Sequence, residues 1–370
     1  MRQPSESTRT TTSAQPESAA KKTDIRKSHI QRADLLNAGV IGYIFLTYGL
    51  GLGLITWPSV LHSDFRPSTL FMNGLFMNGL GIIVLVHSLI LSATLLHELI
   101  HDNIFKAKSR NAFWGQAMTW LNGACYVPYE QLVRHHFNHH VHHADFVPFD
   151  IQGRIATLPL LVKQGLIALE WAYFPAIGFW LRWRNFIEPF NNHRLVHRQT
   201  RTLVVLALRL LFFAGLTYVS AKAVLLYAFA YLCFVNLMRF ADAFHHTYSY
   251  VIEGDIIPKR DRIYEQANTF SNLVAIKHPW LNLLYLNFGY HNAHHHNMRC
   301  PWYQLPQFHR ELYGEQQQNV LPLNTLIGNY HRFRLQRLFD GQGEQSDEPT
   351  KMLAVEEFTG GIGVSFLTPP

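Results

Sequence analysis

Long apolar runs alternate with polar segments along this chain of 370 residues. Residues 35–57 and 69–96 are apolar and long enough to cross a bilayer, which takes about 20 helical residues. A second pair of apolar runs, 202–220 and 223–240, is separated by little more than Ala221 and Lys222. The pattern therefore predicts an all-α integral membrane fold with four transmembrane helices in two hairpins.

The two ends of the chain are polar, and we expect both to be tails. Residues 1–33 are polar and basic and show no signal-peptide pattern, so they predict a disordered cytoplasmic tail. Residues 341–370 predict a flexible C-terminal tail. Residues 34–340 then form the membrane domain. Because basic segments favour the cytoplasmic side, an even number of spans places both termini there.

Histidine is concentrated in four short clusters where apolar runs end. Fourteen of the 22 histidines fall into HELIH (97–101), HHFNHHVHH (135–143), the pair His245–His246 and HNAHHH (291–296). Spacings of three and four residues place side chains on one helix face, and several neutral imidazoles together predict a metal site. A structural zinc needs four ligands, whereas these clusters offer at least twice that number. The predicted spans place all four clusters on the cytoplasmic face.

The same topology decides two mixed segments. Residues 155–181 are apolar but contain two prolines and two charged residues, and a crossing there would separate His246 from His140. We therefore expect an interfacial helix over 155–181, and we place the shorter segment 111–127 in the same way.

Charge and cysteine content limit the function classes. The net charge of +7 suits anionic headgroups or phosphate-bearing substrates. No basic helix or base-stacking platform stands apart from the membrane segments, so we expect no nucleic-acid partner. Cys125, Cys233 and Cys300 are too few and too scattered for a disulfide framework or an iron–sulfur cluster.

Two other classes of metal protein fit parts of the pattern. HELIH matches H-E-x-x-H, the zinc-protease signature in which Glu98 would be the general base. A membrane metalloprotease would need only one further ligand, which leaves three clusters without a role. A metal transporter would place polar ligands near the membrane midplane, whereas only His87 lies deep within a predicted span. Both classes stay open as alternatives.

The segments HELIH, HHFNHH, DAFHHTY and YHNAHH resemble the histidine boxes of the integral-membrane fatty acid desaturases and related hydroxylases. The resemblance covers residues 95–306 and includes the spacing of the spans between the boxes. It implies two non-haem iron ions bound by eight or nine histidines in a cytoplasmic cap. It also implies O2 as co-substrate and the removal of two hydrogens from a fatty acyl chain.

Carried over position by position, the resemblance implies nine iron ligands. They are His97, His101, His136, His139, His140, His246, His291, His294 and His295. The register stays open in the second and third clusters, since His135 competes with His136 and His245 with His246. Asp242 is a candidate for holding a metal-bound water.

Residues beyond these ligands have weaker predictions. Asp145 and Asp150 follow the second cluster and could accept N–H bonds from ligating rings. His142, His143 and His296 are surplus to the boxes.

The resemblance therefore implies a membrane desaturase that introduces a C=C bond into an acyl-lipid or acyl thioester within membrane lipids. Each turnover needs two electrons, and the chain shows no haem motif, cysteine cluster or Rossmann glycine fingerprint. We therefore expect an external ferredoxin or cytochrome-type donor. A lipid hydroxylase or ketolase on the same scaffold is the nearest alternative, because the product depends on how the substrate lies beside the same metals.

Overall fold

The computed structural model describes residues 16–57, 67–252, 254–314, 319–339 and 355–362. The chain divides into two compact units, Met1–Tyr43 and Ile44–Pro370, and the packing described below lies within the second. Its elements, in chain order, are α1 (Pro16–Ile55), α2 (Pro67–Ile100), α3 (Lys108–Asn122), α4 (Tyr129–His142), β1 (Asp145–Val147), α5 (Ile151–Ala156), α6 (Leu160–Trp171), α7 (Ala176–Asn191), η1 (His193–Arg198), α8 (Gln199–Val219), α9 (Ala221–Ala243), β2 (Tyr250–Ile252), α10 (Arg262–Ala267), η2 (Pro279–Tyr285), α11 (His291–His296), α12 (Leu305–Tyr313), α13 (Leu323–Arg332), η4 (Gln336–Leu338) and η5 (Val355–Glu357).

Four helices of the described chain are long and apolar enough to cross a membrane, in agreement with the hydrophobic pattern. The candidate spans are Ala33–Ile55, Gly74–Ile100, His193–Val219 and Ala221–Ala243. The third is mostly exposed, and its exposed side chains include Leu203, Leu210 and Leu211. A helix that is apolar all round and is not covered by protein is typical of contact with lipid.

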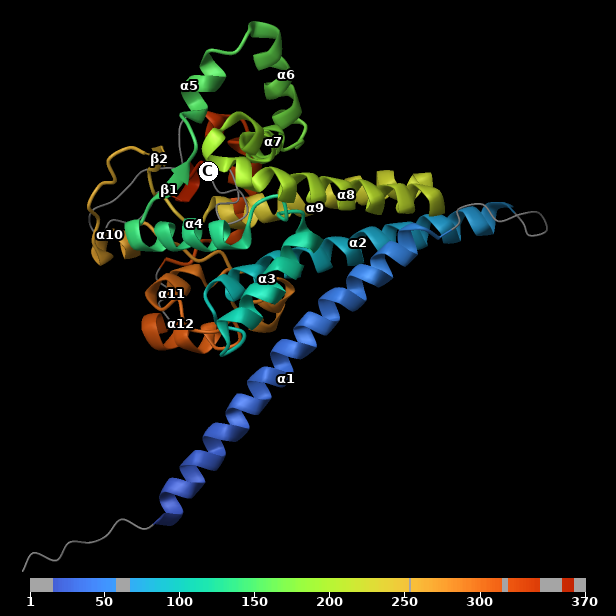
Figure 1. Cartoon of the computed structure of the whole chain (residues 1–370). Coiled ribbons are helices and arrows are strands. Elements are labelled where there is room, and N and C mark those ends of the chain that lie inside the picture. Colours follow the sequence, from blue (N-terminus) through green and yellow to red (C-terminus); the bar gives the residue numbers. More distant parts are fainter. Residues whose placement is uncertain (1–15, 58–66, 253, 315–318, 340–354, 363–370) are drawn as a thin grey trace, which may run out of the picture. The chain divides into compact units, whose positions relative to one another are not determined.

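Helix α9 lies beside both α2 and α8, and α3 packs along α2 (Figure 1). Close approach of α1 to α2 depends on a glycine, because a Cβ at Gly51 would lie 3.0 Å from the Leu85 Cβ. Small residues at such crossings let helices pack tightly without a hydrophobic driving force. The hydroxyls of Tyr48 and Tyr227 lie 3.2 Å apart and connect α1 to α9.

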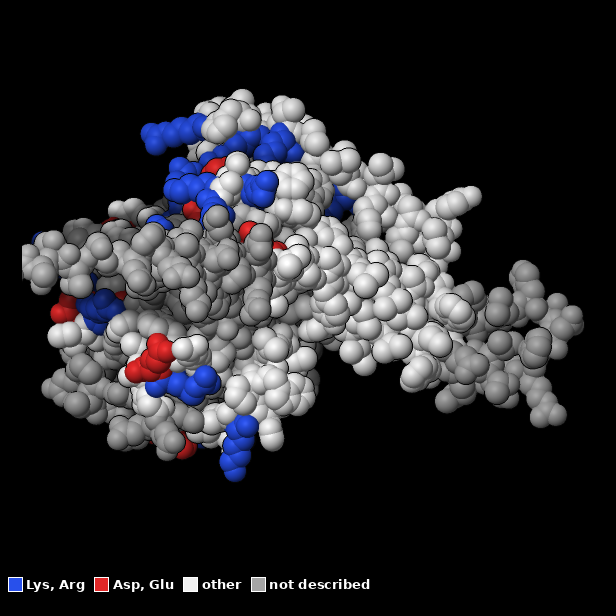
Figure 2. All heavy atoms as spheres, turned by 90° about the horizontal axis from the view of Figure 1, so that it is seen from below, with Lys and Arg blue, Asp and Glu red and all other residues white. Residues whose placement is uncertain are grey.

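Charged side chains are unevenly distributed over the surface. On the face drawn in Figure 2, the lysine, arginine, aspartate and glutamate side chains gather over one part of the surface, and the adjoining white surface is almost uncharged. An uncharged region next to a charged region is the arrangement that a bilayer requires.

The segment 155–181 differs from the single helix that we expected. The structure forms three helices in this region, α5, α6 and α7, with Pro159 and Pro175 at the N-caps of α6 and α7. Proline ends the preceding helix because it disfavours the α conformation in the residue before it and lacks an N–H. None of the three is among the candidate spans of the described chain, and their place at a membrane surface stays a prediction.

Both predicted tails contain structure. Helix α1 begins at Pro16, so it includes residues 16–33 of the segment that we expected to be a tail. In the predicted C-terminal tail, Phe358 and Ile362 are 1% and 3% exposed and pack into the second unit. These two apolar residues stand next to glycines and far along the chain from the other core residues, so the sequence pattern did not predict their burial. Residues 1–15, 340–354 and 363–370 lie outside the described chain.

A short parallel pairing was also not predicted. Strand β1 pairs with β2 in the register Asp145–Tyr250, Phe146–Val251 and Val147–Ile252. The two strands follow α4 and the pair His245–His246, so the pairing connects the segments that carry the second and third histidine clusters.

Candidate metal centre

Four separate parts of the chain bring their histidines to one place. The first cluster is at the end of α2, the second on the inner face of α4, the third directly after α9 and the fourth on α11. All nine histidines expected as ligands are buried, with exposed fractions of 5% or less. The structure divides them into two adjoining groups.

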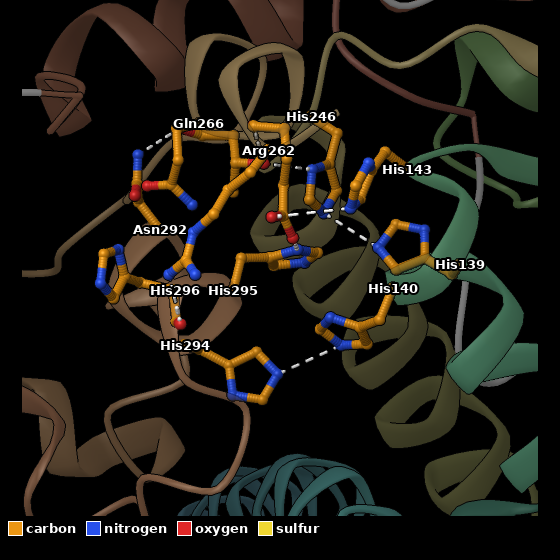
Figure 3. A network of polar contacts seen from close by, with 12 residues as sticks. His139, His140, His143, His246, Arg262, Gln266, Asn292, His294, His295 and His296 are labelled. Carbon is orange, nitrogen blue, oxygen red and sulfur yellow. Dashed lines mark hydrogen bonds and ion pairs between the residues drawn. The ribbon is translucent and has the colours of Figure 1, made fainter. Parts of the chain in front are cut away.

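The first group contains five histidines, which are His97, His101, His136, His140 and His294. One ring nitrogen of each lies within 4.8 Å of the others. The Nε2 atoms of His101 and His136 are 2.9 Å apart, and those of His136 and His140 are 3.2 Å apart. The Nε2 of His294 lies 3.4 Å from that of His140, which brings α11 to α4 (Figure 3).

The second group contains four histidines, which are His139, His246, His291 and His295. The Nε2 of His246 is central, because it lies 3.2 Å from the Nε2 of His139 and 2.8 Å from that of His291. The rings of His140 and His295 stack with centroids 4.2 Å apart, so the two groups touch.

These distances fit nitrogen ligands around a common ion. With a metal–nitrogen distance of about 2.1 Å, two ligands are about 3.0 Å apart at a right angle and about 3.4 Å apart at a tetrahedral angle. The Nε2–Nε2 distances in the two groups lie between 2.8 and 3.4 Å. The Nε2 of His295 is buried and has no hydrogen-bond partner among the described residues, as expected of a lone pair that faces a metal. The donor set therefore fits two metal ions.

In the second group, the opposite ring nitrogens of His139 and His295 contact acceptors that fix the rings. The Nδ1 of His139 lies 2.9 Å from the Asp145 carboxylate and 3.1 Å from the Ala144 carbonyl. The Nδ1 of His295 lies 3.0 Å from Glu265. Such partners orient the Nε2 lone pair toward a metal. The contact from Asp145 agrees with the sequence expectation, whereas Asp150 caps α5 by accepting from the Gly153 N–H.

Burial keeps these imidazoles neutral. Burial and the neighbouring histidines lower the pKa values of His140, His246 and His295 well below the usual value for histidine. Burial also opposes protonation of His139, but the Asp145 carboxylate outweighs this effect and raises its pKa. Neutral rings present the lone pairs that metal binding requires.

The structure gives the surplus histidines positions outside both groups. The Nε2 of His245 lies 2.8 Å from the Asn272 Oδ1, and its ring stacks on His291 with centroids 3.9 Å apart. His135 is on the outer face of α4, and His143 lies 3.6 Å from Glu265. Neither His142 nor His296 belongs to a group of candidate ligands among the described residues.

Asp242 lies beside one of these surplus histidines. Its Oδ1 is 3.7 Å from the Nδ1 of His245, one turn further along the chain. Its role in holding a metal-bound water stays a prediction.

Glu98 of HELIH is 3% exposed and accepts hydrogen bonds. Its Oε2 accepts from the Trp302 backbone N–H at 3.0 Å and from the Asn103 Nδ2 at 3.3 Å. Its Oε1 lies 3.6 Å from the Nδ1 of His97. The carboxylate therefore connects the end of α2 to the segment that follows α11.

Sequence reasoning missed several residues that support the site. Glu265 on α10 contacts His295, Thr269 lies 3.3 Å from the Nδ1 of His246, and Asn272 contacts His245. They lie between the third and fourth clusters in a segment without regular spacing, so no pattern could single them out.

Two cavities lie near the histidines. An apolar cavity of about 260 Å³ lies between α2, α9, η2 and α13 and reaches Asn272. A polar cavity of about 620 Å³ lies against the outer face of α4, where Gln131, Arg134, His135 and Asn138 line it at helical spacing.

The chain has four candidate membrane spans, and its helix ends bring nine buried histidines into two groups that could each hold a metal ion. These features are typical of a membrane protein with a metal centre. The family model described as fatty acid desaturase matches residues 74–326, which is more than half of the chain. The chain belongs to the fatty acid desaturase family. The match contains both groups of histidines and extends beyond the resemblance seen in residues 95–306. No curated protein and no solved structure matches the chain.

Proposed function

We propose that this protein is an O2-dependent fatty acyl desaturase with two iron ions and an external electron donor. The observation that carries the proposal is the division of nine buried histidines into adjoining groups of five and four, within a chain of the desaturase family. The first group would hold one ion and the second group the other. Iron ions bound there would supply the oxidising power to break unactivated C–H bonds, which side chains lack.

The overall reaction balances with one O2 per double bond. The two C–H bonds of the acyl chain give up two electrons and two protons, and the donor supplies two more electrons. Two further protons come from solvent, and O2 is reduced to two molecules of water. Because two of the four electrons do not come from the acyl chain, the reaction needs an external electron donor. A ferredoxin or a cytochrome could supply these electrons.

The chain's own residues would place the substrate. The apolar cavity near Asn272 is suited to an alkyl chain, since Ile90, Met238, Leu323 and similar residues line it. Asn272 contacts His245, which stacks on His291, so this cavity ends next to the second group.

The polar cavity behind α4 is suited to the headgroup or thioester carrier of that chain. Arg134, Arg194 and Arg198 line it, and guanidinium groups recognise phosphate by paired hydrogen bonds. This assignment gives the outer face of α4 a binding role and its inner face a metal-binding role.

We further propose that the four spans form two hairpins and that both termini and all the histidines lie on the cytoplasmic side. The basic N-terminal segment and the even number of spans before each histidine group support this topology. An acyl chain could then reach the metals from the bilayer while its headgroup stays in the interface.

A hydroxylase or ketolase on this scaffold is the nearest alternative, because it would use the same histidines. A metalloprotease is disfavoured, since Glu98 is occupied by Trp302 and Asn103. A transporter is disfavoured because the histidines lie at helix ends rather than midway along the candidate spans.

Elemental analysis of the purified protein tests the metal assignment. We expect two irons per chain, a loss of iron in His101→Ala, and wild-type iron content in His142→Ala, whose residue lies outside both groups. One zinc per chain, or no bound metal, would contradict the proposal and would favour proteolysis or transport.

A further inference from the structure

A segment near the C-terminus is built into the structure close to the second histidine group. Residues 355–362, which we call the C-terminal strap, begin with η5 and continue through five buried residues. Asn329 on α13 donates from its Nδ2 to the carbonyls of Val355 and Phe358, at 2.6 and 3.2 Å. The strap therefore has a defined path along the protein.

The middle of the strap packs between the two chain segments that flank His246. Phe358 is 1% exposed, and its ring lies 5.3 Å from that of Phe244 and 5.7 Å from that of Phe270. Phe244 comes just before the pair His245–His246. On the other side, the Phe270 N–H donates to the His245 carbonyl at 2.8 Å, and the adjacent Thr269 contacts the Nδ1 of His246.

Two glycines bring the strap against the backbone that leads to His246. The Gly361 N–H donates to the Ala243 carbonyl at 2.7 Å. Gly360 has a φ of +81°, and a Cβ there would lie 2.9 Å from the Phe244 ring and 3.0 Å from the Ala243 carbonyl oxygen. Only glycine fits this position, both in conformation and in space.

The end of the strap is held by a buried ion pair. The Ile362 carbonyl accepts from the Arg239 Nε at 3.0 Å, and the same guanidinium donates to Glu170 at 3.0 Å. The Ile362 N–H donates to the Tyr250 hydroxyl at 3.1 Å. The strap thus binds α9 on one side of His246 and β2 on the other.

We propose that the C-terminal strap is a positioning element that holds His246 in the second metal group. The second group depends on His246 more than on any other member, because its Nε2 lies closest to two of the other ligand atoms. The strap lies beyond residue 326, where the family match ends, so the match itself says nothing of it. The inference rests on the proposed two-metal centre.

Gly360→Ala tests the strap with one added methyl group. The matched control is Gly314→Ala, because Gly314 also has a positive φ, of +59°, but a Cβ there would meet nothing within 4 Å. We expect the iron content of Gly360→Ala to fall from two per chain toward one, since the strap contacts described above lead to the segments around His246 of the second group. Gly314→Ala should keep two. Wild-type iron in Gly360→Ala, or the loss of both irons together, would overturn the inference.

Hydrogen exchange gives a second readout that needs no bound iron. In Gly360→Ala, amides in residues 243–248 and 268–272 should exchange at least several-fold faster, while those of α4 keep their wild-type rate. Unchanged exchange in both segments would overturn the role of the strap. If the wild-type protein bound no iron, the two-metal function would fail, and the exchange result alone would decide on the strap.

Discussion

The replacement Glu98→Gln distinguishes two roles of this residue. Glu98 either supports the metal site through its hydrogen bonds or acts as a general base. Gln keeps the size of Glu98 and one carbonyl oxygen, which can still accept from the Trp302 N–H and the Asn103 amide. With Glu98 ionised, each of these two bonds changes from charge-assisted to neutral, which weakens it by about 1 kcal/mol. The total of about 2 kcal/mol corresponds to a loss of roughly 30-fold. This loss should appear in iron affinity, because Glu98 lies beside the Nδ1 of His97.

The assay is conversion of fatty acid in cells that express the variant, together with iron content of the purified protein. Glu98→Gln should retain measurable conversion, and excess iron should restore part of what is lost. The ligand variants His101→Ala and His294→Ala should lose more, because each removes a ring of the first group. A general base contributes about 10² to 10⁴ to a rate. A loss beyond about 10³-fold with both irons still bound would therefore refute the supporting role.

Three further predictions follow from the contacts of the site and its surroundings. His246→Ala should lose the second iron. His245→Ala removes a contact to Asn272 and a stacked ring, and it should lower iron affinity by about 10- to 100-fold. Equal iron loss in the two variants would contradict the assignment of His246 rather than His245 as the ligand. Most of the clustered histidines have pKa values below the unfolded value of about 6.5. The metal-free protein should therefore keep its folding stability above about pH 6.5 and lose it as the pH falls further. His139 has a raised pKa and acts in the opposite sense. A melting temperature that rises on acidification would be evidence against neutral buried rings. Arg239→Met removes the ion-pair partner of the buried Glu170 and should cost about 3–5 kcal/mol of folding stability, measured by thermal unfolding. Arg184→Met breaks only a partly exposed ion pair and should cost less than about 1 kcal/mol. Similar costs for the two variants would contradict a stabilising role of the buried pair.

The apolar runs and histidine spacing were enough to predict the main features of the fold and the candidate site. Length and hydropathy predicted the four long helices, because a helix that spans a bilayer must be apolar over about 20 residues. The i, i+3, i+4 spacing placed His136, His139 and His140 on one face of a helix, and the structure has that helix as α4. Periodicity alone could not separate His245 from His246, since neighbouring residues after a helix end have no fixed direction.

The features that were missed depend on contacts between distant segments. Glu265, Thr269 and Asn272 support histidines from a stretch without any helical or strand period. The buried strap around Phe358 was expected to be a tail, because its few apolar residues are too short a run to predict a core. Long-range packing decides such cases, and a single sequence records it only weakly.

The most direct test of the proposed activity is the fatty-acid profile of cells that express this protein in air, compared with cells that express His294→Ala. The account predicts a new unsaturated fatty acid with the wild-type chain and none with the variant, whose histidine belongs to the first group. Hydroxylated or keto products in its place, or identical profiles from the two strains, would contradict a desaturase.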